Sequence, residues 1–372
     1  MKKVAILCNG TSKTSTDRME LVEKLHENGI QPYCGKVLVS EINEYFSEET
    51  ALLLPIVASR DNTNPLGELK SMASIKKAIK SENIDGAIIY GVKNHAAMAI
   101  GAKMGGAKKI LCVVNGSGNL FRVKGIKGKI LRFISFPMLW LAYKMCTAIC
   151  FQNEDDKALF IKKHLVKDSN KLFVTGGSGV NLDVFTEKEL PEENKFLFLS
   201  RITPSKGITE YIKAAEIVKG KYPDATFDIV GPLDSKVESL EDNLLQKATD
   251  KGTVSYHGAT NDVPSWMGKC RFFVYPSYYP EGVPRCAMQA IASARPIITC
   301  NTQGCKETAV DGVNGFVIPP KNAEILAEKM IWMIEHPEET ERMAKESRRY
   351  AESKFDVNMI NQQLIDKMNG KA

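Results

Sequence analysis

The stretch from residue 272 to residue 300 reads FFVYPSYYPEGVPRCAMQAIASARPIITC, and it decides the fold class of the chain. It contains two short apolar runs, Phe272 to Tyr275 and Pro296 to Cys300, which are typical of fully buried strands. The segment between them, from Val283 to Ala294, has the length and residue types of a helix. A buried strand, a helix and a second buried strand predict a parallel sheet with a crossover helix.

The same alternation of apolar runs and helix-like segments continues along the rest of the chain. Further strands are expected at 4–8, 30–39, 86–90, 109–114, 148–152, 171–174, 196–200, 225–230, 254–257 and 315–318. Further helices are expected at 17–28, 68–81, 95–104, 126–146, 155–165, 207–219, 235–251 and 323–336. This pattern predicts an α/β protein with doubly wound, Rossmann-like parallel sheets.

The chain length and the distribution of charge both predict two domains. A chain of 372 residues is too long for one compact core. The first 176 residues hold 26 basic and 16 acidic residues, a net charge of +10. The remaining residues hold 24 basic and 28 acidic residues, a net charge of −4, so the total of +6 is unevenly distributed. We therefore expect domains at 1–176 and 177–372, with the last helix free to pack back on the first domain.

The basic excess is concentrated between Asp85 and Glu154, where ten Lys or Arg residues occur and no acid. Within this run, five basic residues come directly before an apolar, aromatic segment at 133–143. The residues expected to face a membrane are Arg122, Lys124, Lys127, Lys129 and Arg132, together with Trp140 of the apolar segment. This pattern is typical of an element that rests on an anionic membrane surface without spanning it. The alternative, in which the apolar residues enter the core and the lysines are solvated, stays open. Nucleic-acid binding explains the pattern less well, because no recognised module accompanies it.

The cysteine pattern and the hydropathy exclude several other classes of protein. The nine cysteines form no C-x-x-C pair and no Cys/His cluster with zinc spacing, so we expect buried thiols in a reducing compartment and no bound metal. No apolar run reaches the roughly 18 residues of a membrane-spanning helix. The N-terminal MKKVAILCNG is interpreted as a first buried strand rather than a signal peptide. The protein is therefore expected in the cytoplasm.

The loop from Tyr275 to Arg285 is the first candidate for a binding site, because ligands of such sheets bind beyond the carboxyl ends of the strands. Gly282 lets a ligand approach the backbone, Pro284 suits the first turn of a helix, and the free N–H groups of that helix favour a phosphate. Glu281 can accept hydrogen bonds from sugar hydroxyls. The alternative is an ordinary turn with a helix cap.

The loop from Leu199 to Gly207, LSRITPSKG, is the second candidate. Arg201 and Lys206 lie five positions apart on a turn that Pro204 and Gly207 constrain, a spacing that lets both reach one diphosphate. The alternative is a solvated pair of cations.

Together these loops resemble the family 4 glycosyltransferases of the GT-B architecture. The SRITPSKG turn is similar to the family's donor-diphosphate loop, and Glu281 matches the first acid of its Glu, seven residues, Glu signature. Other matching stretches are FQNEDDKALF at 151–160, TGGSGVNLDVF at 175–185, YHGATNDVPSWMGKC at 256–270 and GCKETAVDGVNGFVIPP at 304–320. PSYYPEGVPR followed by GCKE resembles the branch that extends polyprenyl-diphosphate-linked sugars in capsule, O-antigen or N-glycan assembly.

The resemblance implies two domains facing a cleft, with Arg201 and Lys206 on the donor diphosphate and Glu281 orienting the donor sugar. The donor-binding set that it implies also contains Gly282, Val283, Pro284, Gln289 and Gly231. It further implies a retaining, metal-independent transfer that needs no cofactor, from a UDP-sugar carrying an N-acetylhexosamine or a hexose. The acceptor would be a polyprenyl-diphosphate-linked sugar at the inner face of the cell membrane.

Gln289 departs from the family signature, which has a second acid at this position. An amide still bonds hydroxyl groups but carries no charge. A non-catalytic nucleotide-sugar-binding subunit therefore stays open as an alternative, as does a nucleotide-sugar 2-epimerase of the same architecture.

The acceptor is expected at the first domain, where Gly10, His95 and Asn115 follow strands. His95 can be a base or an acceptor contact, although a cap or surface role is the plainer interpretation. Glu307, in the second domain, can contact the nucleotide or cap its own loop.

Overall fold

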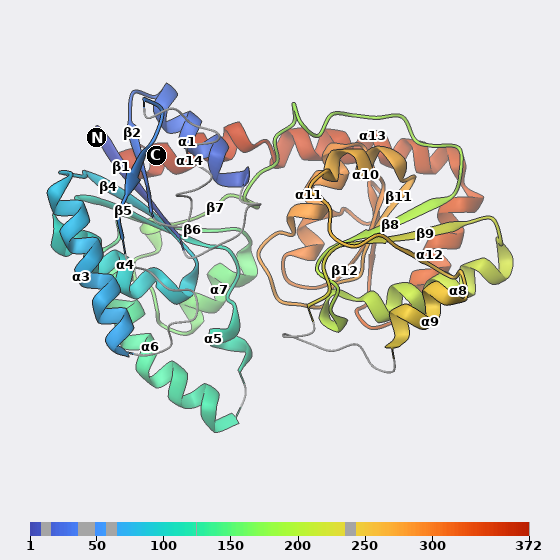
Figure 1. Cartoon of the computed structure of the whole chain (residues 1–372), viewed down its shortest axis with the longest axis horizontal. Coiled ribbons are helices and arrows are strands. Elements are labelled where there is room, and N and C mark those ends of the chain that lie inside the picture. The colour runs from blue at the N-terminus through green and yellow to red at the C-terminus, as the bar shows by residue number, and fades with distance from the viewer. Residues whose placement is uncertain (9–15, 36–48, 57–64, 124, 235–242, 372) are drawn as a thin grey trace. The chain divides into compact units, whose positions relative to one another are not determined.

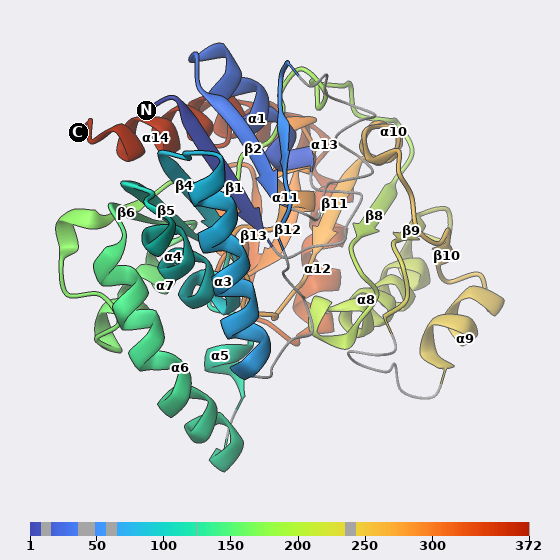
Figure 2. The same cartoon turned by 60° about the vertical axis from the view of Figure 1, so that its left-hand side comes forward.

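The structure is a computed structural model that describes residues 1–8, 16–35, 49–56, 65–123, 125–234 and 243–371. The chain divides into two compact units, one formed by residues 1–178 with 357–372 and the other by residues 179–356 (Figure 1). Each unit has one parallel sheet with helices on both faces (Figure 1 and Figure 2), which confirms the α/β, doubly wound fold class.

Among the described residues, the sheet of the first unit has seven strands in the order β3-β2-β1-β4-β5-β6-β7, and every neighbouring pair is parallel. The direction of strand addition reverses between β1 and β4. The strands are β1 (Lys3–Cys8), β2 (Gln31–Gly35), β3 (Leu52–Leu54), β4 (Gly86–Tyr90), β5 (Lys109–Val114), β6 (Ala148–Phe151) and β7 (Leu172–Val174).

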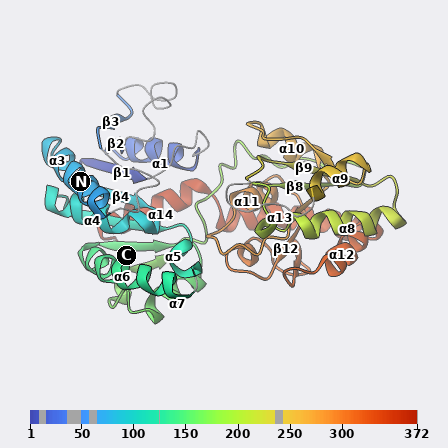
Figure 3. The ribbon, with the colours of Figure 1, turned by 60° about the horizontal axis from the view of Figure 1, so that its bottom comes forward.

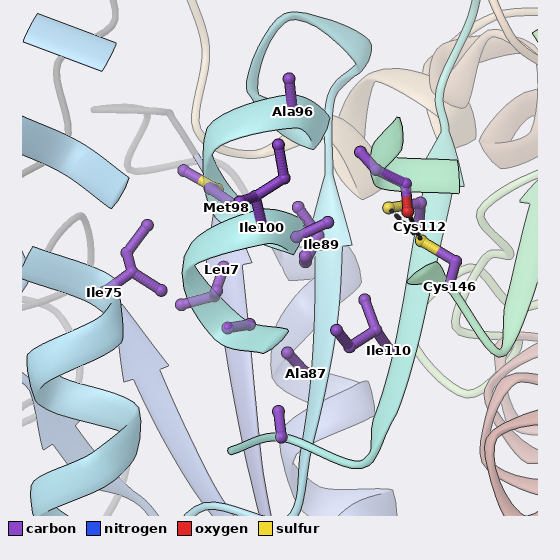
Figure 4. Packing of buried hydrophobic residues seen from close by; sticks show 14 of the residues in the cluster. Leu7, Ile75, Ala87, Ile89, Ala96, Met98, Ile100, Ile110, Cys112 and Cys146 are labelled. Carbon is purple, nitrogen blue, oxygen red and sulfur yellow. Dashed lines mark hydrogen bonds between the residues drawn. The ribbon is translucent and has the colours of Figure 1, made fainter. Parts of the chain in front are cut away.

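Helices cover both faces of this sheet because successive strand residues point to opposite sides. Ala5 and Leu7 of β1 belong to the core under α3, α4 and α6, whereas Val4 and Ile6 belong to the core under α1 and α14. Figure 4 shows part of the first core, where Ile75 of α3 and Ile100 of α4 lie over the strands. The helices are α1 (Thr16–Glu27), α3 (Pro65–Ser81), α4 (Val92–Gly105), α5 (Asn119–Arg122), α6 (Gly125–Met145), α7 (Glu154–Lys162) and α14 (Val357–Asn369).

The sheet of the second unit has six strands in the order β10-β9-β8-β11-β12-β13, again all parallel. Here the order reverses between β8 and β11. The strands are β8 (Lys195–Leu199), β9 (Thr226–Val230), β10 (Ser255–Tyr256), β11 (Phe272–Tyr275), β12 (Ile297–Cys300) and β13 (Gly315–Ile318).

The helices of the second unit also form two layers, as Figure 3 shows from below. Residues of α8, α9 and α12 share one core with Phe196 and Phe198 of β8, and residues of α10, α11 and α13 share the other with Leu197. The helices are α8 (Ile208–Lys221), α9 (Leu244–Asp250), α10 (Val263–Lys269), α11 (Arg285–Ala292), α12 (Ala323–Glu335) and α13 (Pro337–Lys354).

Several boundaries differ from the sequence-based expectation. The strand expected at 30–39 ends at Gly35 within the described residues, and the helix expected at 235–251 is described only over α9. α11 begins at Arg285 and not at Val283, because Pro284 has an extended ψ of 125° and is the N-cap residue. No bounds were expected for β3, α5, α10, α13 or α14; the first three are short, and α13 follows α12 after one intervening residue.

All nine cysteines are free thiols, and eight of them are buried. Across the described residues, every helix is too short or too polar to cross a bilayer.

Candidate active site

The candidate site lies at the switch point of the second sheet, where β8 and β11 are neighbours. The helices that follow these two strands, α8 and α11, belong to different cores on the two faces of the sheet, and ligands of such sheets bind where the strand order reverses. The two loops are SRITPSKG, after β8, and PSYYPEGVP, after β11. Both loops singled out in the sequence therefore meet at one place in the second unit.

Lys206 and Glu281 form a close ion pair across these loops. The Nζ atom of Lys206 lies 2.7 Å from Oε1 of Glu281. The side chains are 8% and 20% exposed, so the pair is shielded from water but still reachable from the surface. Two charges in such a setting interact strongly and hold each other in place.

Three further side chains, from the end of β11 and the loop after it, complete this cluster. The hydroxyl of Tyr275 donates to Oε1 of Glu281 at 2.8 Å and accepts from Nζ of Lys206 at 2.8 Å. The hydroxyl of Ser277 donates to the same Oε1 at 3.3 Å. Lys206 also lies over the ring of Tyr279, 4.9 Å from its centroid. The site is thus a pre-organised set of one carboxylate, one ammonium and three hydroxyl-bearing side chains.

Three glycines allow the site loops to pack backbone against backbone. A Cβ atom on Gly207 would lie 2.3 Å from the carbonyl oxygen of Pro276, and one on Gly304 would lie 1.5 Å from that of Gly282. A Cβ on Gly231 would lie 1.7 Å from the carbonyl oxygen of Ser200. All three also have positive φ, which disfavours other residues. The loops after β8, β9, β11 and β12 therefore converge only because these positions lack side chains.

α11 begins directly after the same loop, with Pro284 as its N-cap residue, and the positive end of its dipole favours an anion there. Gly282 and Pro284 are buried just before it, and the Val283 side chain packs into the core. Gln289 lies one turn into α11 and is partly exposed.

Arg201 does not join Lys206 in the structure. Its Nη1 atom lies 2.9 Å from Oδ2 of Asp234, and its side chain is 46% exposed. The expected convergence of the two cations on one anion is therefore absent from the described geometry, because each cation already has a carboxylate partner.

Glu307 pairs with a residue far along the chain. Its Oε2 atom lies 2.9 Å from Nζ of Lys354, which also donates to the hydroxyl of Tyr350 at 2.9 Å. This ion pair is neither of the two roles expected for Glu307, and it ties the loop of Glu307 to α13.

In the first unit, His95 is buried inside α4, and the structure shows neither the acceptor contact nor the cap or surface role expected for it. The ring is 0% exposed, with Nδ1 2.9 Å from the Tyr143 hydroxyl and Nε2 3.2 Å from the Val113 carbonyl oxygen. A carbonyl can only accept, so Nε2 carries the proton and Nδ1 accepts from Tyr143. Burial lowers the pKa of His95 to about 4, which keeps the ring neutral.

The other two acceptor candidates have different outcomes. Asn115 is exposed directly after β5, where a ligand can reach it. Gly10 lies outside the described residues.

The basic segment forms α6, which has two apolar faces. Leu139, Ala142 and Tyr143 are buried against the first unit. The opposite face is exposed, and Phe133 is 83% exposed; the exposed apolar residues are Ile126, Ile130, Leu131, Phe133, Ile134, Met138, Trp140 and Leu141. The alternative in which the apolar residues enter the core therefore holds for one face of α6, and the other face is left exposed.

The basic residues of this segment divide into two groups. Lys127 and Lys129 are exposed on α6. Arg132 donates from Nη1 to the carbonyl oxygens of Leu120 and Val123, at 3.2 Å and 3.0 Å, and so fixes the turn before α6. Lys124 and the side chain of Arg122 lie outside the described residues.

Sequence reasoning did not single out Tyr275 or Ser277 as site residues. The only signal was a hydroxyl-bearing residue at the end of an otherwise apolar strand, followed by Pro and Ser. In the described part of the chain, no group of three or more His, Cys, Asp or Glu side chains is placed to hold a metal ion.

The chain is similar to several known proteins in sequence and in fold. Residues 182–350 match the family model described as glycosyl transferases group 1. The chain is 27% identical over 365 residues to N,N'-diacetylbacillosaminyl-diphospho-undecaprenol alpha-1,3-N-acetylgalactosaminyltransferase of Campylobacter jejuni, covering 94% of this chain and 93% of that one. It is 26% identical to UDP-Gal:alpha-D-GlcNAc-diphosphoundecaprenol alpha-1,3-galactosyltransferase of Escherichia coli, covering 84% and 81%.

Among solved structures, HepE of Anabaena in complex with UDP aligns over 100% of both chains with a TM-score of 0.78 and 16% identity. The fold, the matched family and the relatives together define the class: the chain is a glycosyltransferase. More particularly, it carries a glycosyl transferases group 1 domain in its second half and has the GT-B type of fold, as its motifs predicted. The 2-epimerase alternative is not favoured.

Proposed function

We propose that this glycosyltransferase moves a sugar from a UDP-sugar to a polyprenyl-diphosphate-linked acceptor in the assembly of a bacterial surface polysaccharide or glycan. The names of the Campylobacter and Escherichia relatives both specify a sugar carried on undecaprenol diphosphate. Solved structures of HepE contain UDP and UDP-glucose. An N-acetylhexosamine or a hexose is the proposed donor sugar.

The observation that carries the donor site is the Lys206–Glu281 pair at the switch point of the second sheet. We propose that Lys206 and the N-terminus of α11 bind the donor diphosphate. Arg201 would leave its partner Asp234 and bind the same diphosphate. Positive charge and backbone N–H groups there would stabilise the negative charge that develops on the departing diphosphate. Because this stabilisation grows toward the transition state, it accelerates the transfer step.

Glu281 is proposed to orient the donor sugar, and Gln289 to bond the nucleotide ribose through its amide. Gly231 and Gly282 bring backbone close to the ligand, with Val283 and Pro284 shaping the start of α11. The proposed transfer is retaining and proceeds without a metal, as the family resemblance implies.

The acceptor is proposed to reach the first unit from the inner face of the membrane, with α6 as the contact. The exposed stripe from Ile126 to Leu141 has the spacing of one helix face, and Lys127 and Lys129 flank it. An apolar stripe with flanking lysines suits shallow insertion among anionic headgroups. Asn115 is the remaining described candidate for acceptor binding.

The experiment is a transfer assay with a short-chain polyprenyl-diphosphate sugar as acceptor and a panel of UDP- and GDP-hexoses and N-acetylhexosamines. Mass spectrometry should show the acceptor gaining one sugar with a UDP-sugar and not with its GDP counterpart. Transfer only from a GDP-sugar, or only to an acceptor without the lipid diphosphate, would contradict the proposal.

A further inference from the structure

Tyr275 occupies an unusual place for a buried tyrosine, at the last position of β11 and in contact with both charged groups of the site. Its side chain is 1% exposed, and a phenol hydroxyl removed from water needs a hydrogen-bond partner. That partner is Oε1 of Glu281, at 2.8 Å, while Nζ of Lys206 donates to the phenol oxygen at 2.8 Å. Tyr275, Lys206 and Glu281 therefore form a closed triangle of hydrogen bonds.

A buried tyrosine in this fold can satisfy its hydroxyl without using charged groups. Tyr211, which is equally buried in the same unit, donates to the carbonyl oxygens of Phe196 and Asp228, at 3.0 Å and 3.2 Å. Tyr275 instead donates its hydrogen bond to the carboxylate of Glu281, which stays partly exposed. This difference separates a purely structural hydroxyl from one that acts on the site.

The hydroxyl of Tyr275 stays a donor at neutral pH. Burial, with the negative charge of Glu281 beside it, raises the pKa of Tyr275 well above its ordinary value. The phenol therefore keeps its proton and bonds the carboxylate as an O–H group.

The three donors to Glu281 share one oxygen. Lys206, Tyr275 and Ser277 all reach Oε1, at 2.7, 2.8 and 3.3 Å. Three bonds to one oxygen fix the rotation of the carboxylate about its last bond. The other oxygen, Oε2, then has a defined direction.

We propose that Tyr275 is a positioning residue, which with Lys206 and Ser277 holds Glu281 by Oε1 so that Oε2 receives a hydroxyl of the donor sugar. This inference rests on the proposed function of Glu281. Loss of the phenol hydroxyl would leave the carboxylate free to rotate and would remove one of the partners of Lys206. Misplacement of a group that acts in the transition state lowers the rate of the step more than it lowers ground-state binding.

The test compares Tyr275→Phe with Tyr211→Phe in the full-length protein. Both substitutions remove one buried phenol oxygen from the second unit, so their melting temperatures should fall by similar amounts. Tyr275→Phe should lower kcat about tenfold with less than a threefold change in KM for the UDP-sugar. Tyr211→Phe should keep kcat within twofold of the wild-type value. Equal kcat values for the two variants would overturn the inference.

A double-mutant cycle with Glu281→Gln shows whether Tyr275 acts through Glu281. If it does, adding Tyr275→Phe to Glu281→Gln should lower the residual kcat by less than about twofold. An undiminished tenfold effect in that background would refute positioning through Glu281. Full activity of Glu281→Gln alone would refute the proposed donor site instead, so the two failures are distinguishable.

Discussion

At the scale of single residues, His95 and Glu281 show how burial decides what a titratable group does. His95 has both ring nitrogens bonded within the first unit and no exposed surface, so it supports the core. Glu281 keeps part of its surface exposed while its neighbours hold one of its oxygens. In the sequence both were polar residues after strands, and only the packing around them separates a core residue from a site residue.

His95 makes the stability of the first unit depend on pH in a defined direction. The pKa of His95 in the folded protein is about 4, below the ordinary value of 6.5. The contribution of the neutral ring to the free energy of unfolding is therefore fully present above pH 6.5 and is lost as the pH falls toward 4. His95→Gln keeps an N–H donor for the Val113 carbonyl but does not titrate. The free energy of unfolding in urea should fall between pH 7.0 and pH 4.5 in the wild type, and it should fall by roughly 2 kcal/mol less in the variant. An equal loss in both proteins would contradict this assignment.

At the scale of elements, the packing of loops on one another builds the site. The sequence placed strands and helices well where apolar runs were long, and β4, β5, β11 and β13 have the expected bounds. It also identified the two loops that carry Lys206 and Glu281. It did not predict the contacts of these loops, because Lys206 and Glu281 are 75 positions apart and their meeting depends on the strand order.

Gly304 is the position where loop packing can be tested most simply. It has a φ of 80°, and a Cβ atom would lie 1.5 Å from the carbonyl oxygen of Gly282. Gly304→Ala should therefore displace the Glu281 loop and weaken UDP binding at least about tenfold by calorimetry. Gly312 is the matched control, because its φ of 72° carries a similar left-handed strain but its Cβ would meet nothing within 4 Å. UDP binding as weak in Gly312→Ala as in Gly304→Ala would show that strain alone, and not the collision, is responsible.

α6 is the element on which the proposed membrane contact depends. Lys127→Glu with Lys129→Glu should reduce co-sedimentation with vesicles that contain anionic phospholipid, by about tenfold or more in partition coefficient at low salt. The control carries the same charge reversal at Lys76 and Lys77, which are exposed on α3, and should bind almost as well as the wild type. A similar loss in both double variants would indicate a response to net charge and would refute a specific role for α6.

At the scale of the whole molecule, the chain forms two units, and the first unit is made of two separate stretches of the sequence. Residues 357–372 return to the first unit, where Leu364, Ile365 and Met368 of α14 join the core beside α1. The apolar spacing in α14 is helical, but spacing alone does not say which sheet a helix covers. The alternating elements and the charge difference indicated two domains and left the last helix free to pack on the first, and the structure shows α14 in the first unit.

The division between the units also gives the second sheet a self-contained candidate site. The Lys206–Glu281 pair, Tyr275, the glycine contacts and the N-terminus of α11 all lie within residues 179–356. The matched family segment, 182–350, covers almost the same residues. The proposed donor site therefore lies in one unit, and α6 belongs to the other.

The most direct test of this account is the initial rate of sugar transfer from the UDP-sugar to the lipid-linked acceptor by Glu281→Gln and by Glu216→Gln. Both variants change one carboxylate to an amide in the second unit, but Glu216 is exposed on α8. The account predicts that Glu281→Gln loses at least about a hundredfold in rate while Glu216→Gln stays within twofold of the wild type. A folded Glu281→Gln variant that transfers sugar at the wild-type rate would contradict it.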